Sequence, residues 1–394
     1  MKVTSKFQLS MVRRQSGTRL WHDTRQRAVR NLYQQAKQIA DKRRNPHLKI
    51  PISDKTTTRT IYFLTPDFDE PAGGIKVIYR HVDILNQAGI DAVVLHQRKG
   101  FRCSWFDNET RVTDVSSSAV GPNDVLVVSE LHADHLAELR PGIRHIVLNQ
   151  SGYLTWTRHG DLVAEYYSNS PDLLGIIVVS EHSVQMLEYA FPDHLVRRVY
   201  NGIDSAVFHP PAGNKLRRIS CFPRRGHKDL DVVLHLLRAR GALQGWEILP
   251  LQGLSQEDWL NRLRASRITL VLSPWEGFGL PPVEAMACGN YVIGYHAFGG
   301  REFMRPEFSC PIEVGDVLTV ASAVERAIDE DSRDEDWCVS RGRQASAFIL
   351  EQYSMQRERE SVVAAYSDLL EGAQGSARRG GNLKAGREGM LRLL

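Results

Sequence analysis

Residues 276–289 read EGFGLPPVEAMACG, and this stretch decides the fold. The apolar run 268–272 precedes it and has the composition of a buried parallel strand. The second half is typical of the first turns of a helix, and Pro281 or Pro282 fits the first helical position, where a missing N–H costs nothing. A strand, a glycine loop and a helix N-terminus in this order predict a site for a phosphorylated ligand.

The composition is that of a soluble, two-domain protein. The chain has 394 residues, of which 42% are hydrophobic and 24% charged. No run approaches the ~18 apolar residues of a membrane-spanning helix, and the N-terminus lacks the apolar core of a signal peptide. The 5 cysteines are dispersed without a CxxC pair, which favours reduced thiols over a structural zinc site. We therefore expect a cytoplasmic protein.

Charge is distributed unevenly along the chain. Residues 1–50 contain 13 Lys and Arg against two acids, and residues 373–394 contain five against one, so the part between them is acidic. Residues 20–43 combine an apolar stripe with a basic face. This segment could lie on an anionic membrane surface, which would hold the protein at the inner membrane face, or it could pack on the globular body.

From Thr60 onward, short apolar runs alternate with helical stretches in two series, separated by the turn-rich segment 201–214. Such alternation is typical of doubly wound α/β domains with parallel sheets, whose ligand sites lie at the carboxyl ends of the strands. We expect strands at 61–65, 91–96, 124–130, 144–150 and 175–180 in the first series, and at 217–223, 246–252, 268–273 and 291–295 in the second.

The same pattern predicts the domain organisation. The predicted segments are a basic, partly helical extension (1–57), a first Rossmann-like domain (58–205), a second Rossmann-like domain (206–354), a closing helix (355–372) and a disordered basic tail (373–394).

Three cations follow the first strand of the second domain. Arg224, Arg225 and Lys228 open a helix there and could neutralise a diphosphate without a metal. A solvated basic loop is the alternative, but the glycine loop of the same domain favours phosphate binding. In the first domain, Gly73 and Gly74 precede a helix, so their amides could face a phosphate or sugar; an ordinary tight turn is the alternative.

The chain offers weak evidence for a metal. The triplet Asp67–Asp69 is a lone DxD pattern, and the histidines at 132, 135, 145 and 159 do not have the spacing of metal ligands. We therefore expect no metal site.

The motif at 276–289, with LSPW before it and Gly299–Gly300 after it, resembles glycosyltransferase family 4, the glycosyl transferases group 1. NGID at 201–204 and GGIKV at 73–77 are similar to two further signatures of that family, so the resemblance covers roughly residues 59–370. It implies a retaining enzyme of GT-B fold, in which two Rossmann-like domains face a central cleft. The first domain would take the acceptor and the second a nucleotide sugar.

The resemblance also implies roles for the donor loop. Glu284 would bind the ribose hydroxyls and Glu276 a hydroxyl of the donor sugar. Backbone amides would hold the sugar and the distal phosphate, in the donor-binding stretch Gly277, Phe278, Gly279 and Leu280.

The diphosphate would be held from both domains. Gly73 and Gly74 would approach it from the first domain. The family's Arg and Lys phosphate pair maps best to Arg224 and Lys228, but the spacing is one residue shorter than usual, so Arg225 competes for the role.

One position departs from the family pattern. Many members carry a histidine after the 144–150 strand, where this chain has Gln150. Gln150 cannot act as a base, but the front-face mechanism that the family implies needs none, because the leaving diphosphate takes the acceptor proton. Arg224 and Lys228 would stabilise the charge that develops. Gln150 and Tyr153 are acceptor-side candidates, and Trp105, Tyr153 and Trp156 could stack on an acceptor sugar or simply pack.

We therefore expect a retaining hexosyl- or deoxyhexosyltransferase that uses a nucleotide-diphosphate sugar as co-substrate, with no other cofactor, and a glycan or lipid-linked acceptor. The basic cluster argues against a glycosidase. A GT-B transferase that acts on or binds nucleic acid is an alternative motivated by the basic N-terminal segment, although no recognition motif accompanies it. The second alternative is a non-catalytic protein that binds a sugar nucleotide.

Overall fold

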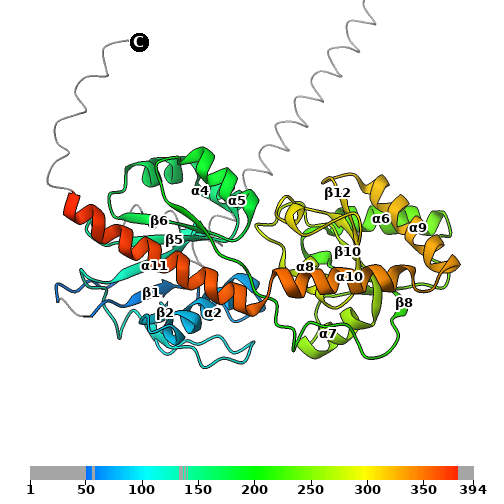
Figure 1. Cartoon of the computed structure of the whole chain (residues 1–394), viewed down its shortest axis with the longest axis horizontal. Coiled ribbons are helices and arrows are strands. Elements are labelled where there is room, and N and C mark those ends of the chain that lie inside the picture. Colours follow the sequence, from blue (N-terminus) through cyan, green and yellow to red (C-terminus); the bar gives the residue numbers. More distant parts are fainter. Residues whose placement is uncertain (1–49, 56–57, 133–135, 137–138, 140, 380–394) are drawn as a thin grey trace, which may run out of the picture. The chain divides into compact units, whose positions relative to one another are not determined.

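The computed structural model describes residues 50–379 apart from 56–57, 133–135, 137–138 and 140 (Figure 1). The side chains at 158, 159, 161, 224 and 373–379 also lie outside the described part. The predicted helix at 20–43 and the end of the basic tail fall outside the described residues. Among the residues that are described, no helix has an apolar stretch long enough to cross a membrane.

The first sheet has seven parallel strands in the order β3-β2-β1-β4-β5-β6-β7. Its strands are β1 (Ile61–Leu64), β2 (Ala92–His96), β3 (Val112–Asp114), β4 (Val125–Ser129), β5 (His145–Asn149), β6 (Leu173–Val178) and β7 (Val196–Arg198). All five predicted runs form strands. Their side chains are apolar on both faces because helices cover both sides of a parallel sheet.

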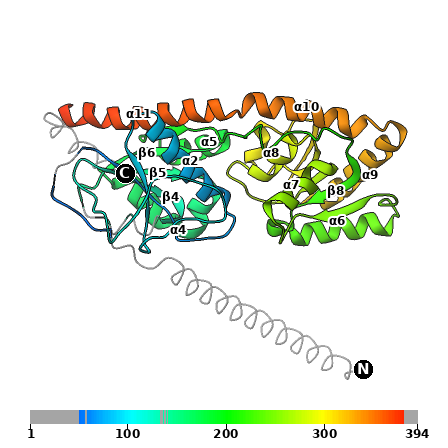
Figure 2. The ribbon, with the colours of Figure 1, turned by 90° about the horizontal axis from the view of Figure 1, so that it is seen from below.

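Helices on both faces complete the first domain. They are α2 (Gly73–Gln87), α4 (Gly152–Asn169) and α5 (Glu181–Ala190), with the short helix η1 (Glu130–His132) after β4. The side chain of Ser180 caps α5 by accepting a hydrogen bond from the amide of Ser183. Figure 2 shows α2 and α4 on opposite faces of the sheet.

The second sheet has five parallel strands in the order β12-β11-β10-β8-β9. They are β8 (Leu216–Cys221), β9 (Glu247–Pro250), β10 (Ser266–Val271), β11 (Tyr291–Tyr295) and β12 (Ser309–Ile312). The helices are α6 (His227–Ala239), α7 (Gln256–Ala265), α8 (Leu280–Ala287), α9 (Val317–Arg333) and α10 (Trp337–Gln352), with the short helices η2 (Pro223–Arg225) and η3 (Gly299–Glu302).

The order of strands in the second sheet locates its ligand crevice. The chain leaves β8 for β9 on one side and returns to β10 on the other, so the strand order reverses between β8 and β10. The loops that follow two such strands diverge and leave a crevice at their carboxyl ends. Those loops carry the predicted cations and the glycine motif.

The last helix returns to the first domain. Helix α11 (Met355–Arg379) packs against α2 and β6 (Figures 1 and 2). The Tyr366 ring lies 5.5 Å from the Phe63 ring, and its hydroxyl lies 3.3 Å from Nδ1 of His81. The helix therefore belongs to the core of the first sheet and runs past the predicted end at 372.

Candidate functional site

The glycine motif forms the loop between β10 and α8. Gly279 is the N-cap of α8 and has φ 98°, a left-handed conformation that side-chain-bearing residues rarely adopt. No side chain caps this helix and its first turn holds no acid. Pro281 and Pro282 have no N–H, and the amide of Val283 donates to the carbonyl of Gly279. Leu280 therefore supplies the amide at the positive end of this helix.

The N-terminus of α2 is also uncapped and lies against the N-terminus of α8. Helix α2 starts at Gly73, its N-cap Ala72 offers no side-chain hydrogen bond, and its first turn also lacks an acid. A Cβ added to Gly73 would lie 2.8 Å from Cδ1 of Leu280, the first residue of α8. The positive ends of two helices therefore converge, which is a favourable place for an anion.

Gln150 lies beside this junction. Its side-chain Nε2 donates a hydrogen bond to the carbonyl of Gly74 at 3.1 Å, and its backbone amide donates to Glu130 at 3.1 Å. A Cβ added to Gly277 would lie 1.8 Å from the Gln150 carbonyl oxygen. Only a glycine at 277 allows the donor loop to approach the first domain this closely.

Glu276 is held by the two loops of the crevice. Its carboxylate accepts hydrogen bonds from Ser273 Oγ at 2.7 Å and from Arg225 Nη1 at 2.9 Å. The side chain of Glu276 is 19% exposed, and that of Arg225 is 54% exposed. The structure thus gives Arg225 a partner in the predicted sugar-binding carboxylate.

The other predicted cations occupy different positions. Lys228 is exposed in the first turn of α6. The backbone of Arg224 forms part of η2, and its side chain lies outside the described part. Lys228 therefore remains accessible to a ligand that enters between β8 and β10.

Glu284 lies one turn into α8, opposite two cations of the first domain. Burial raises its pKa to about 7, although the positive charges of Lys76 and Arg80 on α2 oppose the shift. Burial also lowers the pKa of Lys76. Arg80 forms an ion pair of 2.5 Å with the buried Glu358 on α11. The roles of Lys76 and Arg80 could not be predicted from the sequence, because these residues approach Glu284 only when the domains meet.

Glu302 joins the domains at a second point that the sequence analysis missed. Its carboxylate accepts hydrogen bonds from the amide of Glu181 at 2.9 Å, from Arg198 Nη2 at 2.5 Å and from the Tyr353 hydroxyl at 3.0 Å. Glu302 lies two residues after the Gly299–Gly300 pair of the family motif. This position next to the motif is the sequence feature that could have indicated Glu302.

The aspartates of the DxD pattern organise a loop. Asp67 accepts hydrogen bonds from His96 Nδ1 at 3.0 Å and from the amide of Arg98 at 2.7 Å. Asp69 accepts from the amide and the hydroxyl of Ser104, at 2.6 and 2.7 Å. Both carboxylates thus fix the segment after β2, which lines a hollow of about 510 Å³ with Gln256 of α7.

The predicted aromatic candidates separate into two groups. Trp156 stacks on Phe191 and Trp105 packs on Phe106, both inside the first domain. Tyr153, in the first turn of α4, instead stacks on Trp275, which directly precedes Glu276. Tyr153 is therefore the one of the three that the structure places against the donor loop.

Comparison with known proteins identifies the architecture. Residues 239–344 match the family model described as Glycosyl transferases group 1. MMP alpha-(1->4)-mannosyltransferase of Mycolicibacterium hassiacum is 25% identical over 189 residues, which are 40% of this chain and 46% of that protein. The lipopolysaccharide core biosynthesis mannosyltransferase LpcC of Rhizobium leguminosarum bv. viciae is 24% identical over 237 residues, 50% of this chain and 64% of LpcC. The chain thus spans less than two thirds of either relative.

Solved structures cover more of the chain. Sucrose-phosphate synthase from Thermosynechococcus elongatus superposes with a TM-score of 0.60 at 14% identity, over 80% of this chain and 100% of that one. HepE of Anabaena, in complex with UDP-glucose, superposes with a TM-score of 0.57 at 14% identity, over 78% and 99%. The predicted fold class is confirmed: this chain has the two-domain GT-B fold of glycosyltransferases, and its second domain matches the family of group 1 glycosyl transferases.

Proposed function

We propose that this protein is a retaining glycosyltransferase that moves a hexosyl or deoxyhexosyl group from a nucleotide-diphosphate sugar to a glycan or lipid-linked acceptor. One observation carries the proposal. The uncapped N-termini of α2 and α8 meet at Gly73 and Leu280, beside the carboxylates of Glu276 and Glu284. Two positive helix ends suit a diphosphate, and flanking carboxylates suit the hydroxyls of a sugar and a ribose.

Each part of the donor has a matching group in this arrangement. The diphosphate would accept hydrogen bonds from the amide of Leu280 at the start of α8 and from those of Gly73 and Gly74 at the start of α2, and it would lie close to the positive charge of Lys228. Glu284 would accept hydrogen bonds from the ribose hydroxyls, and Glu276 from a hydroxyl of the transferred sugar. Arg225 would hold the Glu276 carboxylate in position through its hydrogen bond.

The proposed reaction takes place on one face of the sugar. The bond between the anomeric carbon and the phosphate oxygen breaks, and the acceptor oxygen forms its bond to the same carbon. The acceptor proton passes to the departing phosphate oxygen. Negative charge grows on the diphosphate during this step, so Lys228, Arg224 and the helix N-termini stabilise the transition state without a metal.

The named relatives favour this substrate class. Two curated relatives are mannosyltransferases, and one of them acts in lipopolysaccharide core biosynthesis. HepE has been solved with UDP-glucose and with UDP. These properties belong to those proteins, and they motivate a hexose donor and a glycan or lipid-linked acceptor here.

The test is a screen of nucleotide sugars, including UDP-glucose and GDP-mannose, for thermal stabilisation of the full-length protein. A donor present at about 100 times its Kd should raise Tm by about 5 °C. The same donor should be hydrolysed slowly to free sugar and nucleoside diphosphate, and Glu276→Ala should abolish this hydrolysis. Binding without any turnover would identify a non-catalytic sugar-nucleotide-binding protein. Absence of both would refute the proposal.

A further inference from the structure

Three aromatic rings, one from a helix and two from loops, meet beside the donor site. Tyr153 from α4 stacks on Trp275 of the β10–α8 loop, with ring centroids 6.1 Å apart and an interplanar angle of 15°. The Tyr153 ring also lies 5.5 Å from Phe298, in the loop after β11. Tyr153 belongs to the first domain and the other two to the second. We call these three residues the aromatic platform.

Trp275 keeps much of its surface free. It is 55% exposed, one of the few large hydrophobic side chains so exposed in the described part of the chain. Within that part, its recorded ring contact is with Tyr153. An exposed indole beside a ligand crevice offers an apolar face that a ligand can cover, and covering it would gain free energy.

Phe298 is presented by a strained turn. Its backbone has φ 65° and ψ −51°, and the amide of Gly299 donates to the Ala297 carbonyl at 2.9 Å, which closes a three-residue γ-turn. This turn is rare for a residue with a side chain. Such strain persists where the surrounding contacts enforce it, and it is concentrated at ligand-binding and active sites.

The strained turn is bonded to the loop that carries Glu276. The amide of Glu276 donates to the Ala297 carbonyl at 3.3 Å, and the amide of Phe298 donates to His296 Nδ1 at 3.1 Å. Trp275 is the chain neighbour of Glu276. The platform and the proposed sugar-binding carboxylate are therefore parts of one structural unit, and a molecule on Trp275 would lie close to the transferred sugar.

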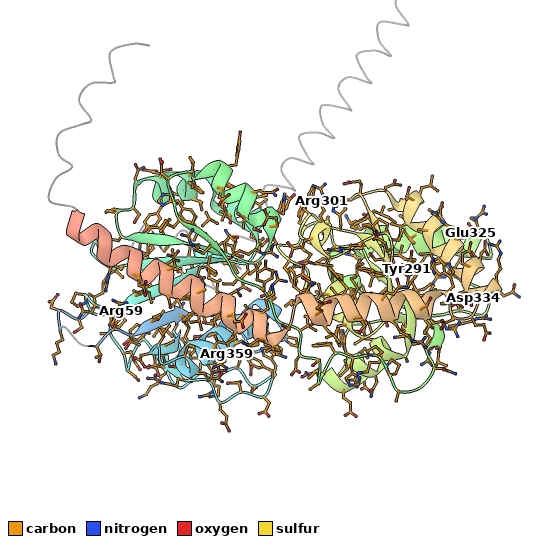
Figure 3. The ribbon with its side chains drawn as sticks, viewed as in Figure 1. Arg59, Tyr291, Arg301, Glu325, Asp334 and Arg359 are labelled. Atoms are coloured by element: carbon orange, nitrogen blue, oxygen red, sulfur yellow. The ribbon has the colours of Figure 1, made fainter. Side chains whose placement is uncertain are left out.

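Polar groups border the platform. The guanidinium of Arg301 lies 4.8 Å above the centre of the Phe298 ring, and its side chain is half exposed. Arg301 belongs to η3 and is labelled in Figure 3. The ring of His182 stacks on Phe298, with centroids 5.2 Å apart, and on Tyr153, with centroids 6.1 Å apart. An apolar face with hydrogen-bonding groups at its edge matches a pyranose, which has a C–H face and a rim of hydroxyls.

We propose that the aromatic platform is the acceptor subsite and that it holds a pyranose ring of a glycan by stacking on Trp275. The proposal rests on the proposed transferase function and narrows its acceptor to a carbohydrate. A sugar stacked there has its hydroxyls directed along the edge shared with Glu276, where the anomeric carbon of the donor would be attacked. Arg301 would donate hydrogen bonds to hydroxyls at the other edge.

The first test measures sugar binding to the full-length protein by saturation-transfer NMR. The probes are methyl α-D-mannopyranoside and methyl α-D-glucopyranoside, and mannitol and sorbitol serve as open-chain controls that lack a flat C–H face. The pyranosides should bind and the open-chain polyols should not. Trp275→Leu should weaken pyranoside binding about tenfold, whereas Trp275→Phe, which retains an aromatic face, should stay within about threefold.

A matched variant controls for the loss of an exposed aromatic residue. Tyr189 on α5 is 92% exposed and lies outside the aromatic platform, so Tyr189→Leu should bind the pyranosides like the unaltered protein. Equal binding by Trp275→Leu and Tyr189→Leu would overturn the proposal. Failure of every pyranoside to bind the unaltered protein would do the same.

The donor screen separates this proposal from the one on which it rests. If Trp275→Leu is stabilised by the donor as the unaltered protein is, and loses only sugar binding, the platform serves the acceptor. If Trp275→Leu also loses the donor, Trp275 acts in packing the donor loop, and the acceptor role is wrong. If no nucleotide sugar stabilises the unaltered protein, the transferase function itself fails, whatever the NMR result.

Discussion

Arg225 Nη1 lies 2.9 Å from Glu276 Oε2, and this ion pair joins the loops that follow β8 and β10. The two strands are neighbours at the point where the strand order of the second sheet reverses. Arg225, which the sequence indicated as a candidate for binding phosphate, therefore orients the Glu276 carboxylate as well. In the proposed reaction, Arg225 would therefore position Glu276, while Lys228 and Arg224 would face the diphosphate.

Replacement of Arg225 should separate positioning from stability. The Arg225 side chain is 54% exposed, so Arg225→Gln should change the free energy of unfolding by less than about 1 kcal/mol. It should nevertheless lower kcat of sugar transfer about tenfold or more, because the Glu276 carboxylate loses one of the two donors that orient it and keeps Ser273 alone. Arg225→Lys should recover part of the rate. A large loss of stability, or a rate unchanged in Arg225→Gln, would contradict the assignment.

Gly277 should not tolerate even one added carbon. The Cβ of Gly277→Ala would lie 1.8 Å from the Gln150 carbonyl, so the donor loop must shift away from the first domain. A displacement of about 1 Å at a reacting centre costs on the order of 100-fold in rate, and we expect a loss of that size.

Gly213→Ala is the matched control for this substitution, because its added Cβ meets nothing within 4 Å. Steady-state transfer rates and thermal unfolding of both variants check the prediction. Comparable activities in the two variants would show that the contact between Gly277 and Gln150 is not needed for catalysis.

The apolar patterning made most of the fold predictable, and two of the strands that it missed are very short. Strands such as Ala92–His96 are uninterrupted apolar runs with turn signals on both sides. The segments Val112–Asp114 and Val196–Arg198 are three residues long and partly polar. They become strands because they pair with the backbone of a neighbouring strand, and no local sequence pattern predicts that pairing. Helices α9 and α10 follow the last recognised motif and were not predicted.

The parts of the candidate site that are formed by consecutive residues could be predicted from the sequence. The glycine motif indicated a loop before a helix, and the structure has one there. The partners of its carboxylates could not be predicted, because Arg225, Lys76 and Arg80 approach them only after strands and domains pack together. Spacing alone could not choose between Arg224 and Arg225, since both follow β8 within one short helix.

Glu284 should make stability depend on pH. Its pKa rises from 4.5 to about 7 on folding, so between these values the folded protein binds a proton that the unfolded chain has lost. The contribution of this group is complete below about pH 4.5 and disappears as pH rises to about 7. Relative to Glu284→Gln, the unaltered protein should therefore lose about 2–3 kcal/mol across this range. Urea unfolding of both proteins at several pH values measures the difference.

Ligand binding should show the opposite trend. Ribose hydroxyls donate to a carboxylate, so nucleoside diphosphate affinity should increase as pH rises through 7 and Glu284 ionises. In Glu284→Gln the affinity should be lower and this part of the pH dependence should vanish. Calorimetric titration with UDP or GDP between pH 6 and 8 provides the measurement. A pH dependence that is the same in both proteins would rule out Glu284 as its source.

Glu302 should hold the two domains together. Its carboxylate accepts from the Glu181 amide and Arg198 of the first domain and from Tyr353 of the second, and Arg198 loses its main counter-charge when Glu302 is removed. We expect Glu302→Ala to lower the free energy of unfolding by about 2 kcal/mol and to increase hydrogen exchange at the start of α5.

Glu335, which is 79% exposed and pairs with Arg217 at the surface, supplies the control, and Glu335→Ala should change stability by less than about 0.5 kcal/mol. If the two variants unfold alike and exchange at α5 stays the same, Glu302 does not restrain the domains, and the contact between the Tyr153 and Trp275 rings must be maintained by the packing around Gln150 and Gly277 alone.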